Sequence, residues 1–219
     1  MLGPKYPKLG MNEAGVVAYP PDDHAGAVSS RPEVRGCLMA RVLDLGCGTG
    51  NLPIRAGVSA KDEVIGVDIA QEALAIARKR FPERAFCLAS AEELPFASGS
   101  FDRVVSAVAL PYMDIPQALA EANRLLAPGG SVFFSLHPLR FTLSEFRRAF
   151  PRIVPTLFRT FVILNGIVLH FAGRVLTLRG RRESFQTRRG IRRLLERSGF
   201  RNIEFSRPEG RLLVRAVVK

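Results

Sequence analysis

The chain has 219 residues, of which 47% are hydrophobic, and it carries 32 Lys and Arg against 20 Asp and Glu. This length and composition predict one globular domain with a sizeable core. Three cysteines without paired spacing and only three histidines argue against a disulfide framework and a zinc site, so we expect a metal-free protein. The sequence shows no secretory pattern at its start, and its longest nearly uncharged run, 161–173, is too short to span a bilayer. We therefore expect a cytoplasmic protein.

The basic charge is concentrated in the last third of the chain. Residues 1–138 hold 13 Lys and Arg against 15 Asp and Glu, whereas residues 139–219 hold 19 against 5. Eighteen of these 19 are Arg, which suits contact with phosphate or carboxylate groups. A solvated, arginine-rich surface explains the same numbers, so the charge alone selects neither interpretation.

In chain order, the first segment is an expected arm. Residues 1–36 are rich in Pro and Gly and have no helical periodicity long enough to bury. We expect this segment to be a mobile arm or lid.

From residue 41 the pattern alternates between strands and helices, which predicts βαβ crossovers and a mostly parallel sheet. Strands are expected at 41–45, 63–68, 85–89, 101–110 and 131–137, and helices directly after residue 50, at 71–81 and at 115–126.

Residues 139–186 break this alternation with a basic and apolar stretch of helical character, interrupted by Pro151, Pro155 and Gly166. We interpret this stretch as a helical insertion after the fifth strand. A helix at 187–200, ended by Gly199, and strands near 202–206 and 211–218 are expected to follow.

Three glycines, Gly46, Gly48 and Gly50, follow the first strand at alternate positions. Glycines at a strand-to-helix turn expose backbone N–H groups and allow a ligand to approach closely, which predicts a nucleotide-like ligand. A dinucleotide and an adenosine ligand without phosphate are both compatible with such a turn. Asp44 would repel a pyrophosphate and attract a cation, so the sequence favours a positively charged ligand.

The stretch DLGCGTG at 44–50 resembles the first motif of the Rossmann-like, class I S-adenosylmethionine-dependent methyltransferases. GVDIA at 66–70, SAEELPFASGSFDRVVS at 90–106 and RLLAPGGSVFFS at 124–135 are similar to later motifs of that family, in the right order. The resemblance implies a methyltransferase domain over 37–219. It also implies a three-layer α/β sandwich around a seven-stranded, mostly parallel sheet whose last strand is antiparallel.

The resemblance also implies which residues bind S-adenosylmethionine. The glycine loop would contact its methionine and ribose parts, Asp68 would accept hydrogen bonds from the ribose hydroxyls, Ala91 and Glu92 would flank the adenine, and Ser106 and Ala107 would lie near the sulfonium. Ser90 stands where the family often has Asp, and Leu110-Pro111-Tyr112 stands where many relatives have Leu-His-His. The expected cofactor residues are Asp44, Gly46, Cys47, Gly48, Gly50, Asp68, Ile69, Ala91, Glu92, Ser106 and Ala107.

Methyl transfer from a sulfonium is an in-line displacement, which mainly requires a well-placed nucleophile. Where the acceptor must lose a proton, a base helps, and the candidate catalytic residues are Tyr112 and His137, with His24 on the arm as a third. A structural role is expected for His170, which lies inside an apolar run.

The composition of the insertion 139–186 indicates the chemical class of the acceptor, because the insertion combines apolar side chains with arginines. This combination favours a small or lipid-like, partly apolar acceptor with an anionic part, or contact with an anionic membrane surface. RNA methylation is the alternative that the basic C-terminal third suggests, and a non-catalytic binding protein is the other. The oligomeric state stays open. The arginines in question are Arg140, Arg147, Arg148, Arg152 and Arg159.

Overall fold

The computed structural model describes residues 39–51, 58–208 and 211–218. The expected arm 1–36 and most of the short helix expected after Gly50 lie outside these residues. The fold described below belongs to the unit Ala40–Lys219.

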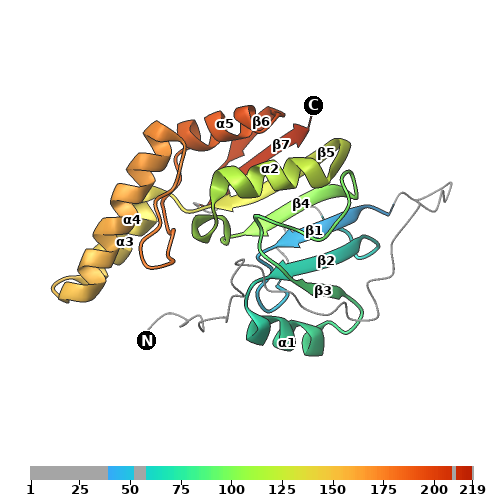
Figure 1. Ribbon diagram of the computed structural model, residues 1–219, viewed down its shortest axis with the longest axis horizontal. Coiled ribbons are helices and arrows are strands. Elements are labelled where there is room, and N and C mark those ends of the chain that lie inside the picture. Colours follow the sequence, from blue (N-terminus) through green and yellow to red (C-terminus); the bar gives the residue numbers. More distant parts are fainter. Residues whose placement is uncertain (1–38, 52–57, 209–210, 219) are drawn as a thin grey trace. The chain divides into compact units, whose positions relative to one another are not determined.

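Seven strands form one sheet in the order β3-β2-β1-β4-β5-β7-β6 (Figure 1). All pairings from β3 to β5 are parallel, whereas β7 runs antiparallel to both β5 and β6. The expected α/β fold, with its mostly parallel sheet and antiparallel last strand, is therefore confirmed. The strands are β1 (Arg41–Leu45), β2 (Glu63–Asp68), β3 (Ala85–Leu88), β4 (Phe101–Ala107), β5 (Leu126–Leu136), β6 (Phe200–Ser206) and β7 (Leu212–Val218).

Alternate residues of the central strands enter two different apolar clusters, as the two-residue period of a strand requires. Leu43, Val104 and Phe134 belong to the main core, which also contains residues of α2 (Ile115–Leu125) and α5 (Arg188–Arg197). Their neighbours Val42 and Val105 belong to a smaller cluster. Helix α1 (Gln71–Arg80) follows β2 and precedes β3. The parallel pairing of β1 with β2 and β4 brings the carboxyl ends of these three strands together at one edge of the sheet.

Two helices, α3 (Leu139–Ala149) and α4 (Ile153–Ala172), follow β5 and lie side by side in Figure 1. The expected helical insertion is present, but Pro155 and Gly166 do not interrupt it. Pro155 occupies the first turn of α4, where a backbone N–H has no partner within the helix in any case. Gly166 packs against a ring from a later segment, which compensates for its low helix propensity. Only Pro151 lies at a boundary, between α3 and α4.

A buried amide on α4 holds the chain that leads back to the sheet. The Asn165 side chain donates to the carbonyl oxygens of Leu176, Arg182 and Glu183 at 2.9–3.1 Å and accepts from the Leu176 N–H at 2.7 Å. Residue 165 is fully buried. Because these bonds satisfy backbone groups of an irregular segment, Asn165 fixes the segment 174–186 against the helix.

Candidate active site

The glycine loop leaves β1 through three residues with positive φ: Gly46 at 71°, Gly48 at 54° and Gly50 at 84°. Its start is fixed because Gly46 and Cys47 donate to the carbonyl oxygen of Val67 at 2.8 and 2.9 Å. A Cβ on Gly48 would meet nothing within 4 Å, so this residue faces open space that a ligand can enter.

The other two glycines have a structural reason as well. A Cβ on Gly46 would lie 2.3 Å from the Cβ of Ala109, and one on Gly50 would lie 2.8 Å from the ring of Phe81. The loop is therefore packed between α1 and the segment after β4. Among the three glycines, only Gly48 combines a positive φ with open space at the position of a Cβ.

Asp68, at the end of β2, faces this loop. Its Oδ2 accepts from the Gly48 N–H and its Oδ1 accepts from the Ala70 N–H, both at 2.8 Å. Each carboxylate oxygen has a second lone pair left for a ligand hydroxyl. The apolar side chain of Ile69 beside it is half exposed. A fixed bidentate acceptor next to an exposed apolar side chain suits a ribose and the base attached to it.

Asp44 lies one residue before the end of β1 and is buried. Burial raises the pKa of its carboxyl to about 7; the positive charge of Arg84 opposes this shift, and Asp68 adds to it. Arg84 is held at the loop because it donates to the carbonyl oxygen of Gly50 at 3.2 Å. Burial also raises the pKa of the Cys47 thiol, with Asp44 contributing, so Cys47 is a protonated filler and not a nucleophile.

The segment expected to flank the adenine is tied to a distant part of the chain. Glu92 accepts from the Asp114 N–H at 2.7 Å and from the Ser90 hydroxyl. Its Oε1 also forms an ion pair with Arg182 at 3.2 Å. Ala91 is buried. The carboxylate of Glu92 thus joins the loop after β3, the start of α2 and the segment after α4.

At the end of β4, the two residues expected near the sulfonium differ in exposure. Ser106 is fully buried, and its hydroxyl has no hydrogen-bond partner among the described residues, whereas Ala107 is partly exposed. Val108 follows with a φ of 64°, a conformation that β-branched residues rarely adopt, and its side chain is exposed. Such strain persists only where the surroundings enforce it. It marks the carboxyl end of β4 as a constrained turn.

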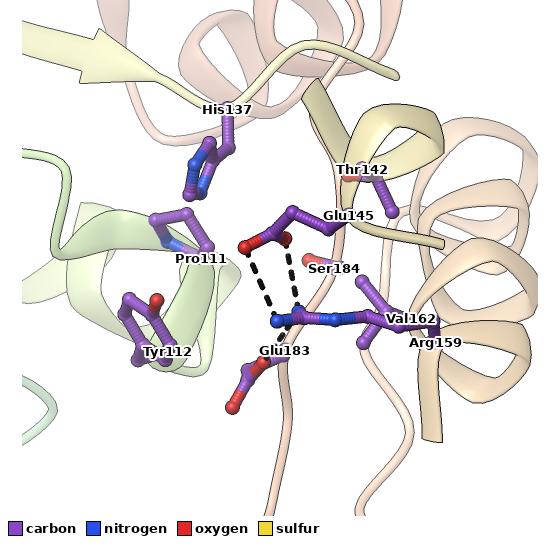
Figure 2. A pocket seen from close by; sticks show the side chains of 9 residues that line it. All are labelled: Pro111, Tyr112, His137, Thr142, Glu145, Arg159, Val162, Glu183 and Ser184. Carbon is purple, nitrogen blue, oxygen red and sulfur yellow. Dashed lines mark hydrogen bonds and ion pairs between the residues drawn. The ribbon is translucent and has the colours of Figure 1, made fainter. Parts of the chain in front are cut away.

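The two candidate bases meet in one pocket (Figure 2). Tyr112 lies on the short 3₁₀ helix η2 (Leu110–Tyr112), and His137 directly follows β5. Both side chains line the pocket, and the remaining wall comes from α3, α4 and the segment before α5. The lining residues are Pro111, Tyr112, His137, Thr142, Glu145, Arg159, Val162, Glu183 and Ser184.

Three charged side chains form one wall of this pocket. Arg159 forms ion pairs with Glu145 at 3.0 Å and with Glu183 at 3.7 Å. Arg159, one of the arginines expected to favour an anionic acceptor, is thus paired with two carboxylates. Burial raises the pKa of Glu183, while Arg159 opposes this.

His137 is held by its backbone. Its N–H donates to the side-chain oxygen of Gln186 at 2.7 Å, and its carbonyl oxygen accepts from the Gln186 N–H at 2.8 Å. Its ring stacks on Phe141, with centroids 4.3 Å apart. Burial, and then the charge of Arg159, lower the pKa of the imidazole below its usual value. A neutral imidazole at neutral pH is able to accept a proton.

Several residues of the site were not identified from the sequence. Arg182 and Gln186 contact residues 90 and 49 positions away in the sequence, and Asn165 lies within an apolar run. No local sequence pattern reveals these three residues. The Glu145–Arg159 pair spans 14 residues between two helices. His170, expected to be structural, contacts the Thr187 hydroxyl at 2.7 Å, at the start of α5. His24 lies outside the described residues.

Comparison with known proteins agrees with this architecture. Residues 43–134 match the family described as the methyltransferase domain. A demethylmenaquinone methyltransferase of Thermus thermophilus is 32% identical over 169 residues, which cover 73% of this chain and 74% of that protein. A 2-phytyl-1,4-naphtoquinone methyltransferase of Thermosynechococcus vestitus is 37% identical over 127 residues, covering 53% and 56%. This chain therefore spans little more than half the length of the second relative.

A solved structure shares the fold. The S-adenosylmethionine-dependent methyltransferase of Thermotoga maritima, described as a possible histamine N-methyltransferase, superposes with a TM-score of 0.58 at 20% identity, and 84% of each chain is covered. The chain belongs to the Rossmann-like, class I S-adenosylmethionine-dependent methyltransferases. It is accordingly an enzyme of the methyltransferase class, and its cofactor is S-adenosylmethionine.

The residues at the glycine loop fit this cofactor. The open space at Gly48 admits a ligand, Asp68 offers fixed acceptors for two hydroxyls, and Asp44 offers a carboxylate to a cation. When bound, the cofactor supplies an electrophilic methyl group on a positively charged sulfur. The roles of the individual site residues remain predictions.

Proposed function

We propose that the enzyme methylates a small, lipid-like, partly apolar acceptor of the quinol or phenol type, whose reactive group approaches the residues that line the small pocket between η2 and the helices α3 and α4. The observation that carries this proposal is the meeting of Tyr112 and His137 in that pocket, beside helices rich in exposed apolar side chains. The names of the relatives from Thermus and Thermosynechococcus support it, because both refer to quinone-type molecules.

The proposed chemistry is an in-line displacement. The nucleophilic carbon or oxygen of the acceptor forms a bond to the methyl carbon while the bond from that carbon to sulfur breaks, and the electron pair goes to sulfur. The acceptor loses a proton, and His137 accepts it because its imidazole is neutral at neutral pH. Tyr112 lines the same pocket and orients the hydroxyl of the acceptor through its own phenol group.

Arg159 acts on this step through His137. Glu145 and Glu183 hold its guanidinium in place, and its charge, after burial, lowers the pKa of His137, which keeps the free imidazole neutral but makes it a weaker base. Since two carboxylates surround the guanidinium, the wall does not favour a strongly anionic acceptor group. A neutral phenolic hydroxyl fits this wall better than a phosphate.

The test is transfer of a labelled methyl group to three acceptors: a reduced naphthoquinone with an isoprenoid tail, the same ring without the tail, and structured RNA. We expect methylation of the tailed quinol, weaker methylation of the bare ring, and none of RNA. His137→Gln should lower kcat about 100-fold and leave cofactor affinity unchanged. His170→Gln is the matched control, because His170 does not line the pocket.

Two results would contradict the proposal. The first is methyl incorporation into RNA in preference to the quinols, which would favour the alternative drawn from the basic C-terminal third. The second is an unchanged kcat in both His137→Gln and Tyr112→Phe, which would remove the pocket from the reaction.

A further inference from the structure

Helix α4 exposes large apolar side chains along most of its length. By length and composition it could cross a membrane, yet only 22% of its most apolar stretch is buried, which is far less than in the core helix of a globular protein. Most of the exposed apolar positions are three, four or seven residues apart, so they share one face of the helix, on which the exposed Thr160 lies between Leu157 and Leu164. The exposed apolar positions are Ile153, Val154, Leu157, Leu164, Ile167 and Phe171.

The opposite face of α4 packs against the rest of the domain. Asn165 makes its four backbone bonds there, Gly166 packs against Phe185, and Arg159 forms its ion pairs with Glu145 and Glu183. Spanning a bilayer would break these contacts and leave the guanidinium without its partners. The helix is therefore suited to lie along a membrane surface, with one face on the domain and the other exposed.

The turn between α3 and α4 extends the exposed apolar surface. Phe150, Ile153, Val154 and Leu157 are 65–77% exposed. We call these four residues the hairpin tip. Large apolar side chains gathered in this way are unusual on a soluble surface and mark an interaction site.

Three arginines lie next to the hairpin tip in the sequence. Residues 139–182 contain nine Arg and one acidic residue, Glu145, which is paired with Arg159. Arg147, Arg148 and Arg152, next to the tip, are exposed and form no ion pair among the described residues. An apolar tip with unpaired guanidinium groups is complementary to acyl chains beneath anionic headgroups.

A second copy of the chain suits this surface less well. A symmetric dimer through the tip would bring two sets of the same arginines together, and like charges at an interface are destabilising. An anionic lipid surface neutralises these charges.

We propose that the hairpin tip is a membrane-docking surface, which inserts among the acyl chains of an anionic bilayer while Arg147, Arg148 and Arg152 contact the lipid phosphates. Docking does not depend on the proposed acceptor, although it would place the pocket where a lipid-like acceptor is dissolved.

The experiment is flotation of the cofactor-free full chain with vesicles of phosphatidylcholine, with or without anionic phosphatidylglycerol. The wild type should float with the anionic vesicles, less so as salt is raised, and weakly with pure phosphatidylcholine. Arg147→Gln, Arg148→Gln, Arg152→Gln should weaken binding about 100-fold. Ile153→Ser, Val154→Ser, Leu157→Ser should weaken it by about the same factor or more.

The matched control is Ile76→Ser, which removes an exposed apolar side chain from α1 and should leave flotation unchanged. Cofactor binding by each variant confirms that it is folded. Flotation of the tip variant equal to that of the wild type would overturn the proposal. So would a tip-dependent dimer in light scattering without vesicle binding. Because no acceptor is present, failure here is distinguishable from failure of the proposed quinol methylation.

Discussion

The ring of Phe185 lies against the backbone of Gly166 so closely that a Cβ on residue 166 would stand 2.1 Å from Cδ1 of the ring. Phe185 is buried and precedes Gln186, which holds the backbone of His137. This contact therefore connects the middle of α4 with the residue expected to act as base.

Gly166→Ala should destabilise the protein. Alanine gains about 1 kcal/mol of helix propensity over glycine, but the clash with Phe185 should cost about 1–3 kcal/mol because neither backbone can retreat easily. Urea unfolding should show a net loss, relieved by Phe185→Leu in the double variant. Leu164→Ala, on the exposed face of the same helix, should change little. A more stable Gly166→Ala protein would contradict the packing described.

Asn165→Ala should loosen the segment 174–186. The substitution removes one amide and leaves buried backbone groups without partners, at a cost of about 1–3 kcal/mol. Hydrogen exchange should rise in 174–186 while α2 stays protected. Thr160→Ala, at an exposed position of the same helix, serves as the control. Unchanged exchange would show that other contacts hold this segment.

Asp68→Ala should weaken binding of S-adenosylmethionine. Loss of hydrogen bonds to the ribose should cost on the order of 2 kcal/mol, about 30-fold in Kd. Calorimetry measures this, and Glu72→Ala, which removes a nearby exposed carboxylate from the first turn of α1, is the control. Equal affinities of Asp68→Ala and the wild type would remove Asp68 from the cofactor site.

Cofactor affinity should depend on pH through Asp44. With a pKa of about 7, this carboxyl is mostly neutral at pH 6 and mostly charged at pH 8. Because the charged form attracts a cation, the affinity for S-adenosylmethionine should rise with pH, by at most about tenfold per unit below pH 7. Calorimetry across this range should give a flat profile for Asp44→Asn. The same slope in both proteins would exclude Asp44 as the group that titrates.

The buried Asp44 carboxyl also lowers the folding stability of the cofactor-free protein as the pH rises. Its pKa in the folded state lies above the ordinary value of 3.8, so folding favours the neutral form. Stability from this source is present at low pH and is lost as the pH rises from about 4 to about 7. Asp44→Asn should therefore raise the melting temperature at pH 8 by several degrees and have little effect at pH 4.

Much of this architecture was predictable because its signals are local. The glycine loop, Asp68 and the strand periodicity each occupy a few consecutive residues, and the structure places the loop and Asp68 as the pattern indicates. The strand bounds were less exact, since β4 ends at Ala107 and not at residue 110, and β5 begins at Leu126 and not at residue 131. Gly199, predicted to end α5, has a φ of 85° two residues after the helix. Such features depend on backbone geometry, which short sequence patterns record well.

The pocket was less predictable because its contacts are long-range. From the sequence, Arg159 would be expected to be a solvated surface arginine. In the structure, Glu145 on α3 lies beside it and forms an ion pair with it. In the sequence, Asn165 and Gly166 look like breaks in an apolar run. In the structure, they are the positions where the segment before α5 packs on α4. The structural roles of Asn165 and Gly166 depend on which face of α4 is covered, and the sequence of the helix alone does not show which face that is.

The ion pair between Arg182 and Glu92 joins parts of the chain 90 residues apart. Glu92 belongs to the loop expected to flank the adenine, and Arg182 immediately precedes Glu183 and Ser184 in the pocket wall. We infer that this ion pair links the proposed adenine loop to the proposed acceptor wall, so that binding at one site affects the other. Since such coupling is reciprocal, a factor by which the cofactor tightens acceptor binding is the same factor by which the acceptor retains the cofactor. Arg182 is the residue through which this mutual dependence of the two affinities would act.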